Sequence, residues 1–192
     1  MKSHFYAYMA RMKLIRRWGL CRNTIPENDQ EHSFLVAMIA HGLAVIRNTR
    51  YHGRVDEGRV TMLAVYHEAP EVITGDLATP IKYFNPGIKK AYKEIERIAA
   101  EKLFSYLPDD LKSGYEWLLF PDEDSEEWKI VKAADRISAY VKCIEELGYG
   151  NGEFSKAEES IRKSIEALDI PEANDFMKEF VPSFRLSLDA LN

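Results

Sequence analysis

The sequence predicts an all-α protein, a single-domain helical bundle that spans residues 1–192. Apolar residues recur at intervals of three and four along most of the chain, which is the period of one face of an α-helix. No run shows the alternation of a β-strand, and no repeat, low-complexity tract or linker-like segment divides the chain. With 46% hydrophobic and 11% aromatic residues, the chain can bury a core of its own.

The first half of the chain is expected to form three main helices. Residues 5–15 carry one apolar face and predict an amphipathic helix, and residues 21–28 form a polar loop. Residues 29–48 are apolar nearly all round, which predicts a central buried helix. Asp56 is a candidate N-cap for the next helix. Pro70 ends or kinks that helix, because proline lacks an N–H and crowds the carbonyl four residues earlier.

The second half of the chain predicts further helices. Asn85-Pro86 is typical of an N-cap followed by a first-turn proline. The helix that it begins has one apolar stripe, which comprises Ile88, Tyr92, Ile95, Ala99 and Leu103. A short helix over 111–119 and a long helix over 126–147 follow, and glycines end the long one. Two last helices are expected over 153–168 and 172–191, the second interrupted at its internal proline.

Composition excludes several classes of protein. The formal charge of −5, from 26 Lys+Arg and 31 Asp+Glu, argues against a generally basic binder of nucleic acid polymers. Cys21 and Cys143 are too few for a disulfide scaffold, which favours a reducing compartment. The longest apolar stretch, residues 34–46, is shorter than the roughly 18 residues of a membrane span, and charges interrupt any signal peptide. We therefore expect a cytoplasmic protein without a membrane partner.

Four polar residues lie where the helical pattern calls for apolar ones. They are His32, His67, Glu68 and Asp135. Buried charges are costly unless they are paired, so such groups usually have partners. Two imidazoles and two carboxylates suit a divalent cation such as Mn, Co, Fe, Ni or Zn. Taken singly, each residue is better explained as a hydrogen-bonded core group; taken together, they favour a metal site.

Other polar residues lie near these four in sequence. Glu71 follows His67 by four residues, so a continuous helix would place both on one face, where Glu71 could be a metal ligand, a general acid or base, or a hydrogen-bond partner. Arg17 suits bidentate phosphate binding, and Trp18 offers a flat wall to a sugar or base. The polar loop 74–80 could carry substrate contacts. The alternatives are a solvated carboxylate, a surface arginine and a packing tryptophan.

Larger motifs now become recognisable. The order of His32, His67-Glu68 and Asp135 resembles the H…HD…D signature of the HD-domain superfamily of metal-dependent phosphohydrolases. Further motifs resemble its bacterial 5'-deoxynucleotidase branch, from Ser3-His4-Phe5 to Leu186-Ser187-Leu188. These motifs are Arg17-Trp18, Glu31-His32-Ser33, Tyr66-His67-Glu68-Ala69-Pro70-Glu71-Val72, Thr74-Gly75-Asp76-Leu77, Thr79-Pro80, Lys82-Tyr83-Phe84-Asn85 and Phe180-Val181-Pro182-Ser183-Phe184.

The resemblance implies a helical bundle of the HD-domain type that forms a homodimer. It implies hydrolysis of deoxyribonucleoside 5'-monophosphates to a deoxynucleoside and phosphate, with little action on ribonucleotides. It also implies one divalent metal cation, Co, Mn or similar. The metal ligands carried over to this sequence are His32, His67, Glu68 and Asp135.

The resemblance also implies roles for the remaining residues. Arg17 would orient the phosphate, Trp18 would crowd the 2' position of the sugar, and Glu71 would assist proton transfer. Substrate contacts are expected from Arg17, Trp18, His32, Glu68, Asp76, Leu77, Ala78 and Thr79.

This sequence departs from the resembled pattern at two positions. Glu68 stands where the family has Asp, and its longer side chain cannot place the carboxylate identically without a shift. Glu68 could ligate bidentately, change the metal preference or fail to ligate. Ala78 replaces a proline, which loosens the loop that faces the nucleoside. The alternatives are another HD-type phosphohydrolase, a nucleotide- or metal-binding protein with chemistry impaired by Glu68, and a purely structural helical protein.

Overall fold

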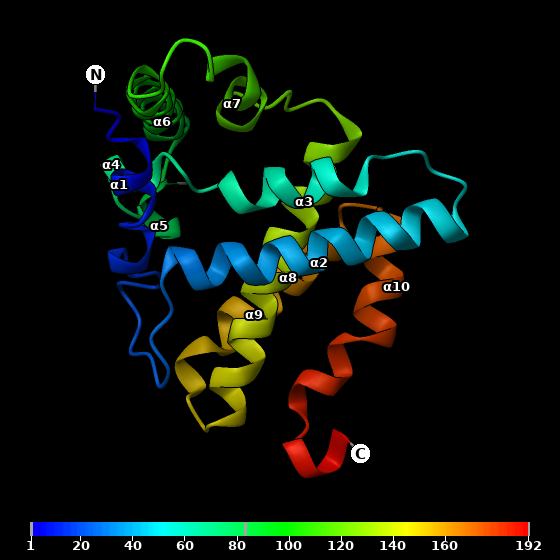
Figure 1. Ribbon diagram of the computed structural model, residues 1–192. Helices are drawn as coiled ribbons and strands as arrows, with labels where there is room; N and C mark the ends of the chain where they lie inside the picture. Colours follow the sequence, from blue (N-terminus) through cyan, green and yellow to red (C-terminus); the bar gives the residue numbers. More distant parts are fainter. Residues whose placement is uncertain (1, 83, 192) are drawn as a thin grey trace.

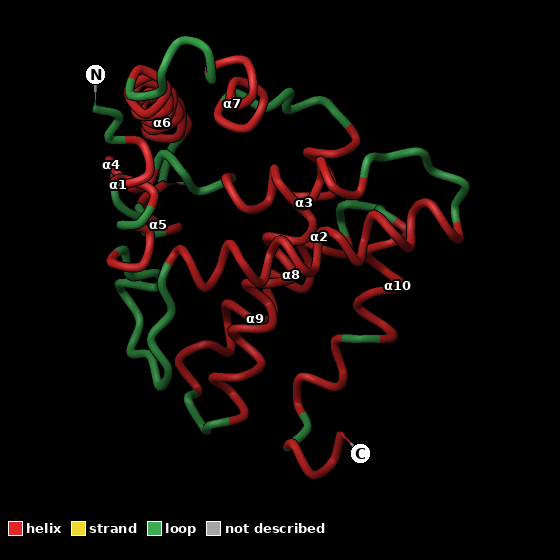
Figure 2. Tube along the Cα trace, viewed as in Figure 1, coloured by secondary structure: helices red, strands yellow, loops and turns green. Residues whose placement is uncertain are grey.

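The computed structural model describes residues 2–82 and 84–191, and its regular structure is helical (Figures 1 and 2). Within these residues no strand forms, and a single isolated bridge joins Arg16 to Asn28. This confirms the predicted all-α class. None of the helices in this part of the chain is long and apolar enough to cross a membrane. Tyr83, from one of the resembled motifs, lies outside the described residues.

Three helices form the centre of the molecule. They are α2 (Asp29–Arg50), α3 (Glu57–Tyr66) and α8 (Glu126–Gly148), and each packs against the other two (Figure 1). Helix α8 is the long helix predicted over 126–147. Burial of apolar side chains between the three helices supplies the main driving force for this packing. Buried members include Val36, Leu43, Val60, Val131 and Ile137.

Local sequence signals set where these helices begin. The Asn28 side chain accepts hydrogen bonds from the backbone N–H groups at 30 and 31, and Glu31 reaches back to the Asn28 N–H, which completes a capping box. The Asp56 side chain caps α3, as predicted. Asn85 caps α6 (Pro86–Ser105), which confirms the Asn85-Pro86 start.

A second layer packs beside the centre. Helix α6 contacts α1 (Phe5–Met9) and α7 (Lys112–Leu119), and a small apolar cluster fills the space around them. Two one-turn helices, α4 (Glu71–Thr74) and α5 (Thr79–Lys82), also pack against α6. The buried members of the cluster are Phe5, Ala69, Leu103, Leu107 and Leu119.

The last third of the chain covers the other side of the centre. A 3-10 turn, η2 (Gly152–Phe154), leads into α9 (Ser155–Glu166), which packs on α8. Helix α10 (Pro171–Glu179) packs against α2. Two further 3-10 turns follow, η3 (Val181–Arg185) and η4 (Leu188–Leu191).

Two predicted helices are shorter than the sequence suggested. The helix expected over 5–15 ends at Met9 and resumes only as a 3-10 turn, η1 (Met12–Leu14), because Ile15 is extended and its carbonyl accepts the Asp29 N–H. The helix expected over 172–191 ends at Glu179, before Pro182, since proline disfavours helical geometry in the preceding residue and cannot donate a helical hydrogen bond.

Two predicted buried faces are also narrower. Ile95, placed in the inward stripe of α6, is 50% exposed, because three residues leave it about 60° around the helix from Tyr92. Helix α2 is central but not buried all round: Phe34, Met38 and Val45 form one exposed apolar stripe. Its buried residues face α3, α8 and α10.

Candidate active site

The four polar residues singled out in the sequence meet at one point. His32 comes from α2, His67 and Glu68 from the turn after α3, and Asp135 from α8. One nitrogen or oxygen from each lies within 4.8 Å of all the others. His32 Nε2 is 3.2 Å from Asp135 Oδ1. The three central helices therefore bring together groups that are far apart in sequence.

The His67 imidazole is oriented by the helix that precedes it. Its Nδ1 lies 2.7 Å from the Ala64 carbonyl oxygen, which can only accept, so Nδ1 carries the proton. Nε2 then faces the cluster, 3.4 Å from Glu68 Oε1 and 3.9 Å from Asp135 Oδ1. This nitrogen is buried and has no hydrogen-bond partner within the described part of the chain. Such an arrangement is typical of a histidine that binds a metal.

The His32 side chain is buried between α2 and α8. Its Nδ1 lies 3.2 Å from Ser138 Oγ, a hydroxyl that can either donate or accept. His32 Nε2 can therefore hydrogen-bond Asp135 or release its proton and become a ligand. Burial and the neighbouring Arg17 charge lower the pKa of His32, which favours the neutral imidazole that metal binding requires.

Both carboxylates of the cluster are ionised. Burial alone would raise the pKa of Glu68, but the adjacent His67 and Arg17 lower it to about 2. Burial likewise opposes ionisation of Asp135, yet Lys132 and the hydrogen bond from His32 hold its pKa well below the usual range. Lys132 Nζ is 2.8 Å from Asp135 Oδ2, so Oδ1 is the oxygen that faces the cluster. The cluster offers an unpartnered imidazole nitrogen and two charged carboxylates, which fits one divalent cation.

Arg17 lies directly beside this cluster. Its Nη1 is 3.6 Å from Glu68 Oε1 and 3.8 Å from Asp29 Oδ1, and its Nε is 3.3 Å from Glu27 Oε2. The Arg17 backbone N–H donates to the Glu27 carbonyl, so the loop folds back on itself at this point. A guanidinium with two N–H edges beside a cluster that could hold a cation is suited to binding a phosphate.

Trp18 is held in an unusual backbone conformation. Its φ of 58° lies in the left-handed region, which is uncommon for a residue other than glycine. Two contacts hold its side chain: Nε1 donates to Glu27 Oε2 at 3.2 Å, and the ring packs on Phe154 with centroids 5.2 Å apart. The indole next to Arg17 is therefore fixed in place.

Glu71 is buried at the first position of α4. The continuous helix that would join it to His67 does not form, because α3 ends at Tyr66 and Pro70 begins a separate turn. Burial, followed by the nearby charges of Glu68 and Asp29, raises the pKa of Glu71 to about 11. At neutral pH this side chain is therefore a protonated carboxyl that can donate a proton.

The predicted loop 74–80 is a loop only in part. Gly75, with φ 72°, makes the turn after α4, and the Tyr92 hydroxyl donates to its carbonyl oxygen at 3.2 Å. Burial raises the pKa of Asp76, against the opposing effect of Arg17. The prediction of an uninterrupted loop was wrong, because α5 begins at Thr79. Asp76, Leu77 and Ala78 are half-buried, and Thr79 is exposed.

Four residues at this site were not identified from the sequence. The Asp29 side chain is fully buried beside Arg17, and burial raises its pKa to about 7. Glu27 accepts hydrogen bonds from Arg17 and Trp18. Lys132 and Ser138 lie three residues before and after Asp135, so helical spacing alone could have placed them on its face.

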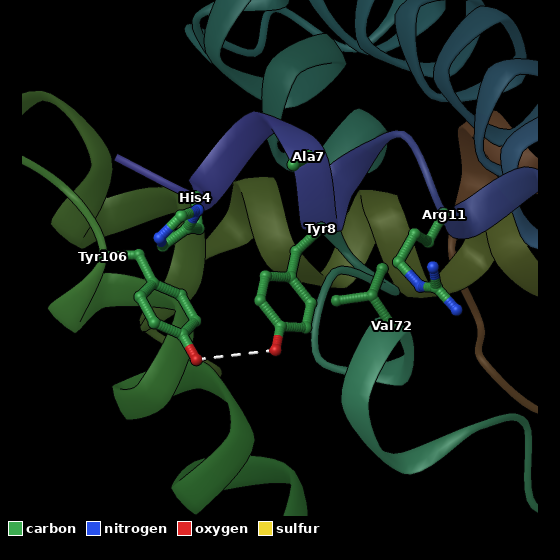
Figure 3. Close-up of a pocket in the computed structure, with 6 residues that line it drawn as sticks. All are labelled: His4, Ala7, Tyr8, Arg11, Val72 and Tyr106. Atoms are coloured by element: carbon green, nitrogen blue, oxygen red, sulfur yellow. Dashed lines mark hydrogen bonds between the residues drawn. The ribbon is translucent and has the colours of Figure 1, made fainter. Parts of the chain in front are cut away.

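A separate cavity of about 570 Å³ opens beside α1 (Figure 3). The Tyr106 hydroxyl is 3.5 Å from the Tyr8 hydroxyl, and the two rings stack with centroids 5.1 Å apart. No member of the four-residue cluster lines this cavity. Its lining residues are His4, Ala7, Tyr8, Arg11, Val72 and Tyr106.

Comparison with known sequences agrees with this arrangement. A family model described as 5'-deoxynucleotidase YfbR-like matches residues 4–184. Two relatives named 5'-deoxynucleotidase come from Yersinia pestis (strain Pestoides F) and Yersinia pseudotuberculosis serotype O:3 (strain YPIII). Each is 49% identical over 191 residues, which covers 99% of this chain and 97% of the relative.

Solved structures share the fold at lower sequence identity. An HD-domain phosphohydrolase from Listeria innocua has a TM-score of 0.83 and 21% identity, and the match covers 94% of this chain and 88% of that one. The cyanophage S-2L HD phosphohydrolase DatZ, solved with dA and one catalytic Zn²⁺ ion, has a TM-score of 0.66 and 19% identity, with 93% and 95% covered. These likenesses confirm the HD-domain type of helical bundle.

Proposed function

This chain belongs to the YfbR-like 5'-deoxynucleotidase family, and from that premise we propose that it hydrolyses deoxyribonucleoside 5'-monophosphates to a deoxynucleoside and phosphate. The chain is thus a phosphoric monoester hydrolase. The observation that carries the proposal is the buried, unpartnered Nε2 of His67, which faces two ionised carboxylates beside an arginine. This combination fits a cation and a phosphate at adjacent positions.

One divalent cation is the proposed cofactor. His32, His67, Glu68 and Asp135 would hold it. When bound, such a cation supplies Lewis-acid activation of water and of a phosphoryl oxygen. The mixed imidazole and carboxylate set suits Co²⁺, Mn²⁺ or a similar first-row ion. The Zn²⁺ ion named with DatZ belongs to the same class.

Arg17 is proposed to bind and orient the phosphate. Arg17 Nη1 lies 3.6 Å from a Glu68 oxygen and 3.8 Å from an Asp29 oxygen. Both distances are longer than those of good charge-assisted hydrogen bonds. A phosphate can therefore take up these N–H groups without breaking short hydrogen bonds. Because phosphoryl transfer develops charge on the equatorial oxygens, the same contact stabilises the transition state.

Glu71 is proposed to be the general acid. When the bond between phosphorus and the 5' oxygen breaks, the electron pair goes to that oxygen, and the Glu71 carboxyl supplies its proton. The attacking water releases a proton, which restores the acid. The raised pKa of Glu71 supports this role, since an ionised carboxylate could not donate.

The nucleoside is proposed to lie between the Trp18 indole and the loop after α4. Trp18 would crowd the 2' position of the sugar, which favours deoxyribose over ribose. Its fixed position supports this steric role, because a mobile ring would not exclude a hydroxyl. Further contacts to the substrate are assigned to His32, Glu68, Asp76, Leu77, Ala78 and Thr79.

We also propose that the chain forms a homodimer in the cytoplasm and that all of residues 1–192 form one domain. The exposed stripe of Phe34, Met38 and Val45 on α2 supports a contact with a second copy, since aligned apolar side chains gain by leaving water. Both cysteines are free, which suits a reducing compartment.

Phosphate release tests the proposal. Metal-stripped protein is supplied in turn with Mn²⁺, Co²⁺, Zn²⁺ or Mg²⁺ and with matched deoxy- and ribonucleoside 5'-monophosphates. We expect metal-dependent release from the deoxy substrates. Release from neither sugar series with any metal would overturn the proposed function, and release from both series alike would overturn the selectivity.

A further inference from the structure

One oxygen of Glu27 holds two neighbouring residues of the site at once. Glu27 Oε2 accepts a hydrogen bond from Arg17 Nε at 3.3 Å and another from Trp18 Nε1 at 3.2 Å. The side chains of Arg17 and Glu27 are both only 13% exposed, so water competes little with these bonds. The residue proposed to bind phosphate and the one proposed to exclude ribose thus share a single acceptor.

The backbone conformation of Trp18 has to be held by contacts with its surroundings. A left-handed φ is disfavoured for any residue that has a Cβ, so surrounding contacts must hold Trp18 in this conformation. Asn23 Nδ2 and the Cys21 N–H donate to the Trp18 carbonyl oxygen at 3.3 and 2.9 Å and hold the backbone, while the bond to Glu27 and the packing on Phe154 hold the indole. Without Glu27, the polar edge of the indole would lose its acceptor and keep only the ring contact.

Glu27 itself has a fixed position at the base of the loop. Its carbonyl oxygen accepts the Arg17 N–H at 3.1 Å, and the Asp29 N–H donates to the Ile15 carbonyl at the same distance. The next residue, Asn28, is the N-cap of α2 and is locked in the capping box. The Glu27 side chain therefore projects from a rigid point.

The far end of the same loop is anchored to α8. The buried carboxylate of Glu146 accepts the Thr24 N–H at 2.9 Å and the Ile25 N–H at 3.2 Å. The buried Lys142 ammonium donates to Glu146 and to the Ile25 carbonyl oxygen. The loop backbone is therefore held both at its base, by the Arg17–Glu27 and Ile15–Asp29 bonds, and at residues 24 and 25. The side chains of Arg17 and Trp18 are the parts that remain to be positioned.

We propose that Glu27 is a positioning residue that couples phosphate orientation to sugar selection. It acts by holding the Arg17 guanidinium and the Trp18 indole in one fixed relation. The inference rests on the proposed function. In the absence of Glu27, the carboxylates left beside the guanidinium are Asp29 and Glu68, at 3.8 and 3.6 Å, so Arg17 would be drawn toward a proposed metal ligand.

Substitution of Glu27 should alter both turnover and selectivity. In Glu27→Ala, we expect the ratio of kcat/KM for deoxyadenosine monophosphate to that for adenosine monophosphate to fall by about tenfold or more, the scale of losing one charge-assisted hydrogen bond. We also expect kcat on the deoxy substrate to fall. In Glu27→Gln, the amide oxygen still accepts from the indole but carries no charge for Arg17, so selectivity should recover more than kcat does.

A double-mutant cycle with Trp18→Phe separates positioning from general loosening. Phenylalanine keeps an aromatic wall but removes the Nε1 donor. If Glu27 acts on selectivity through the indole N–H, Glu27→Ala should change the deoxy-to-ribo ratio little further in the Trp18→Phe background. Full additivity of the two effects on that ratio would overturn the coupling.

Glu153→Gln is the matched control. Glu153 pairs with Arg22 of the same loop at 3.7 Å, but that arginine is 96% exposed, so the pair contributes little. We expect this control to match the wild type in selectivity and kcat. Thermal melting and metal stoichiometry identify any variant that fails to fold, and Glu27→Gln, which keeps the shape of the side chain, then provides the test.

The outcomes distinguish this inference from the proposed function. A wild type that releases no phosphate from any monophosphate overturns the proposed function. In that case, calorimetry of inorganic phosphate binding tests the arginine contact alone. Equal phosphate affinity in wild type and Glu27→Ala then overturns the inference. A selective, active wild type with an equally selective and active Glu27→Ala variant overturns the inference and leaves the proposed function intact.

Discussion

Replacement of Glu71 by glutamine should stabilise the fold while it abolishes proton donation. The wild-type carboxyl is buried with only 4% of the residue exposed, and one of its oxygens has no hydrogen-bond partner among residues 2–82 and 84–191. Glutamine has the same shape and no charge to bury. The substitution therefore removes the cost of keeping a proton on this group in the folded protein.

The magnitude follows from the pKa of Glu71 in the two states. In the unfolded chain the carboxyl has its ordinary pKa of 4.5, whereas burial and neighbouring carboxylates raise it to about 11 in the fold. At pH 7 the folded chain holds a proton that the unfolded chain releases. That difference costs the wild type about 3 kcal/mol of folding free energy, since each pKa unit is worth about 1.4 kcal/mol.

The direction of the Glu71 pKa shift on folding determines how stability depends on pH. Because the folded pKa is raised, the stability associated with Glu71 is complete below pH 4.5 and is lost as the pH rises from there toward the folded pKa. Glu71→Gln lacks this loss. The gap between variant and wild type should therefore open at about 1.4 kcal/mol per pH unit from pH 5 to pH 7.

Urea unfolding of the metal-free proteins at pH 5, 6 and 7 measures this gap directly. Glu123→Gln is the control, because Glu123 is half exposed and pairs only at the surface with Lys93. Parallel pH profiles for wild type and Glu71→Gln would refute the protonated, buried state of Glu71. With metal restored, kcat of Glu71→Gln should fall by about 10²–10⁴ fold, the usual contribution of a general acid.

Three further substitutions test the other assigned roles. Arg17→Ala should lower kcat by about 10²–10³ fold, while metal affinity stays within about threefold when measured by competition with a chelating dye. Activity equal to that of the wild type would remove Arg17 from the mechanism. Trp18→Ala should lower the deoxy-to-ribo ratio of kcat/KM by about tenfold, and an unchanged ratio would reject the steric account. Glu68→Asp withdraws the carboxylate by about 1.5 Å and should weaken metal affinity about tenfold. A gain in turnover would instead favour a site impaired by Glu68.

The cluster of His32, His67, Glu68 and Asp135 was predictable because its residues break a strong pattern. His32 and Asp135 interrupt apolar helices, and a polar residue in such a place needs a partner. The pattern also predicted the central helices, since their buried faces repeat at helical intervals. It could not assign distances, because the four residues come from segments that meet only in the folded chain.

Glu27 and Asp29 could not be found in this way. In the sequence they flank Asn28 and are typical of acidic residues at a helix start, where the helix dipole favours them. Their burial arises because the loop after residue 15 folds back and places Arg17 between them. That contact depends on the Trp18 turn and on the anchor at Glu146, neither of which has a local sequence signal. The same reason explains why the first helix was predicted too long.

The crowding of carboxylates around Arg17 resolves an apparent conflict in an acidic site that is proposed to bind an anion. Burial and the charges of Glu68, Asp29 and Asp76 raise the pKa of Glu71, which keeps its proton in place. Arg17 offsets part of that negative field and offers its N–H groups at distances that leave room for a better acceptor. Neutralising Glu68 would remove the largest single charge acting on Glu71, so the proposed cation binding and the proposed proton donation would be coupled through one carboxylate. It follows that Glu68→Gln should lower the pKa of Glu71 in the metal-free protein. The stability of this variant should then fall less steeply with pH than the stability of the wild type, but only in the pH range where Glu71 begins to ionise in the folded protein.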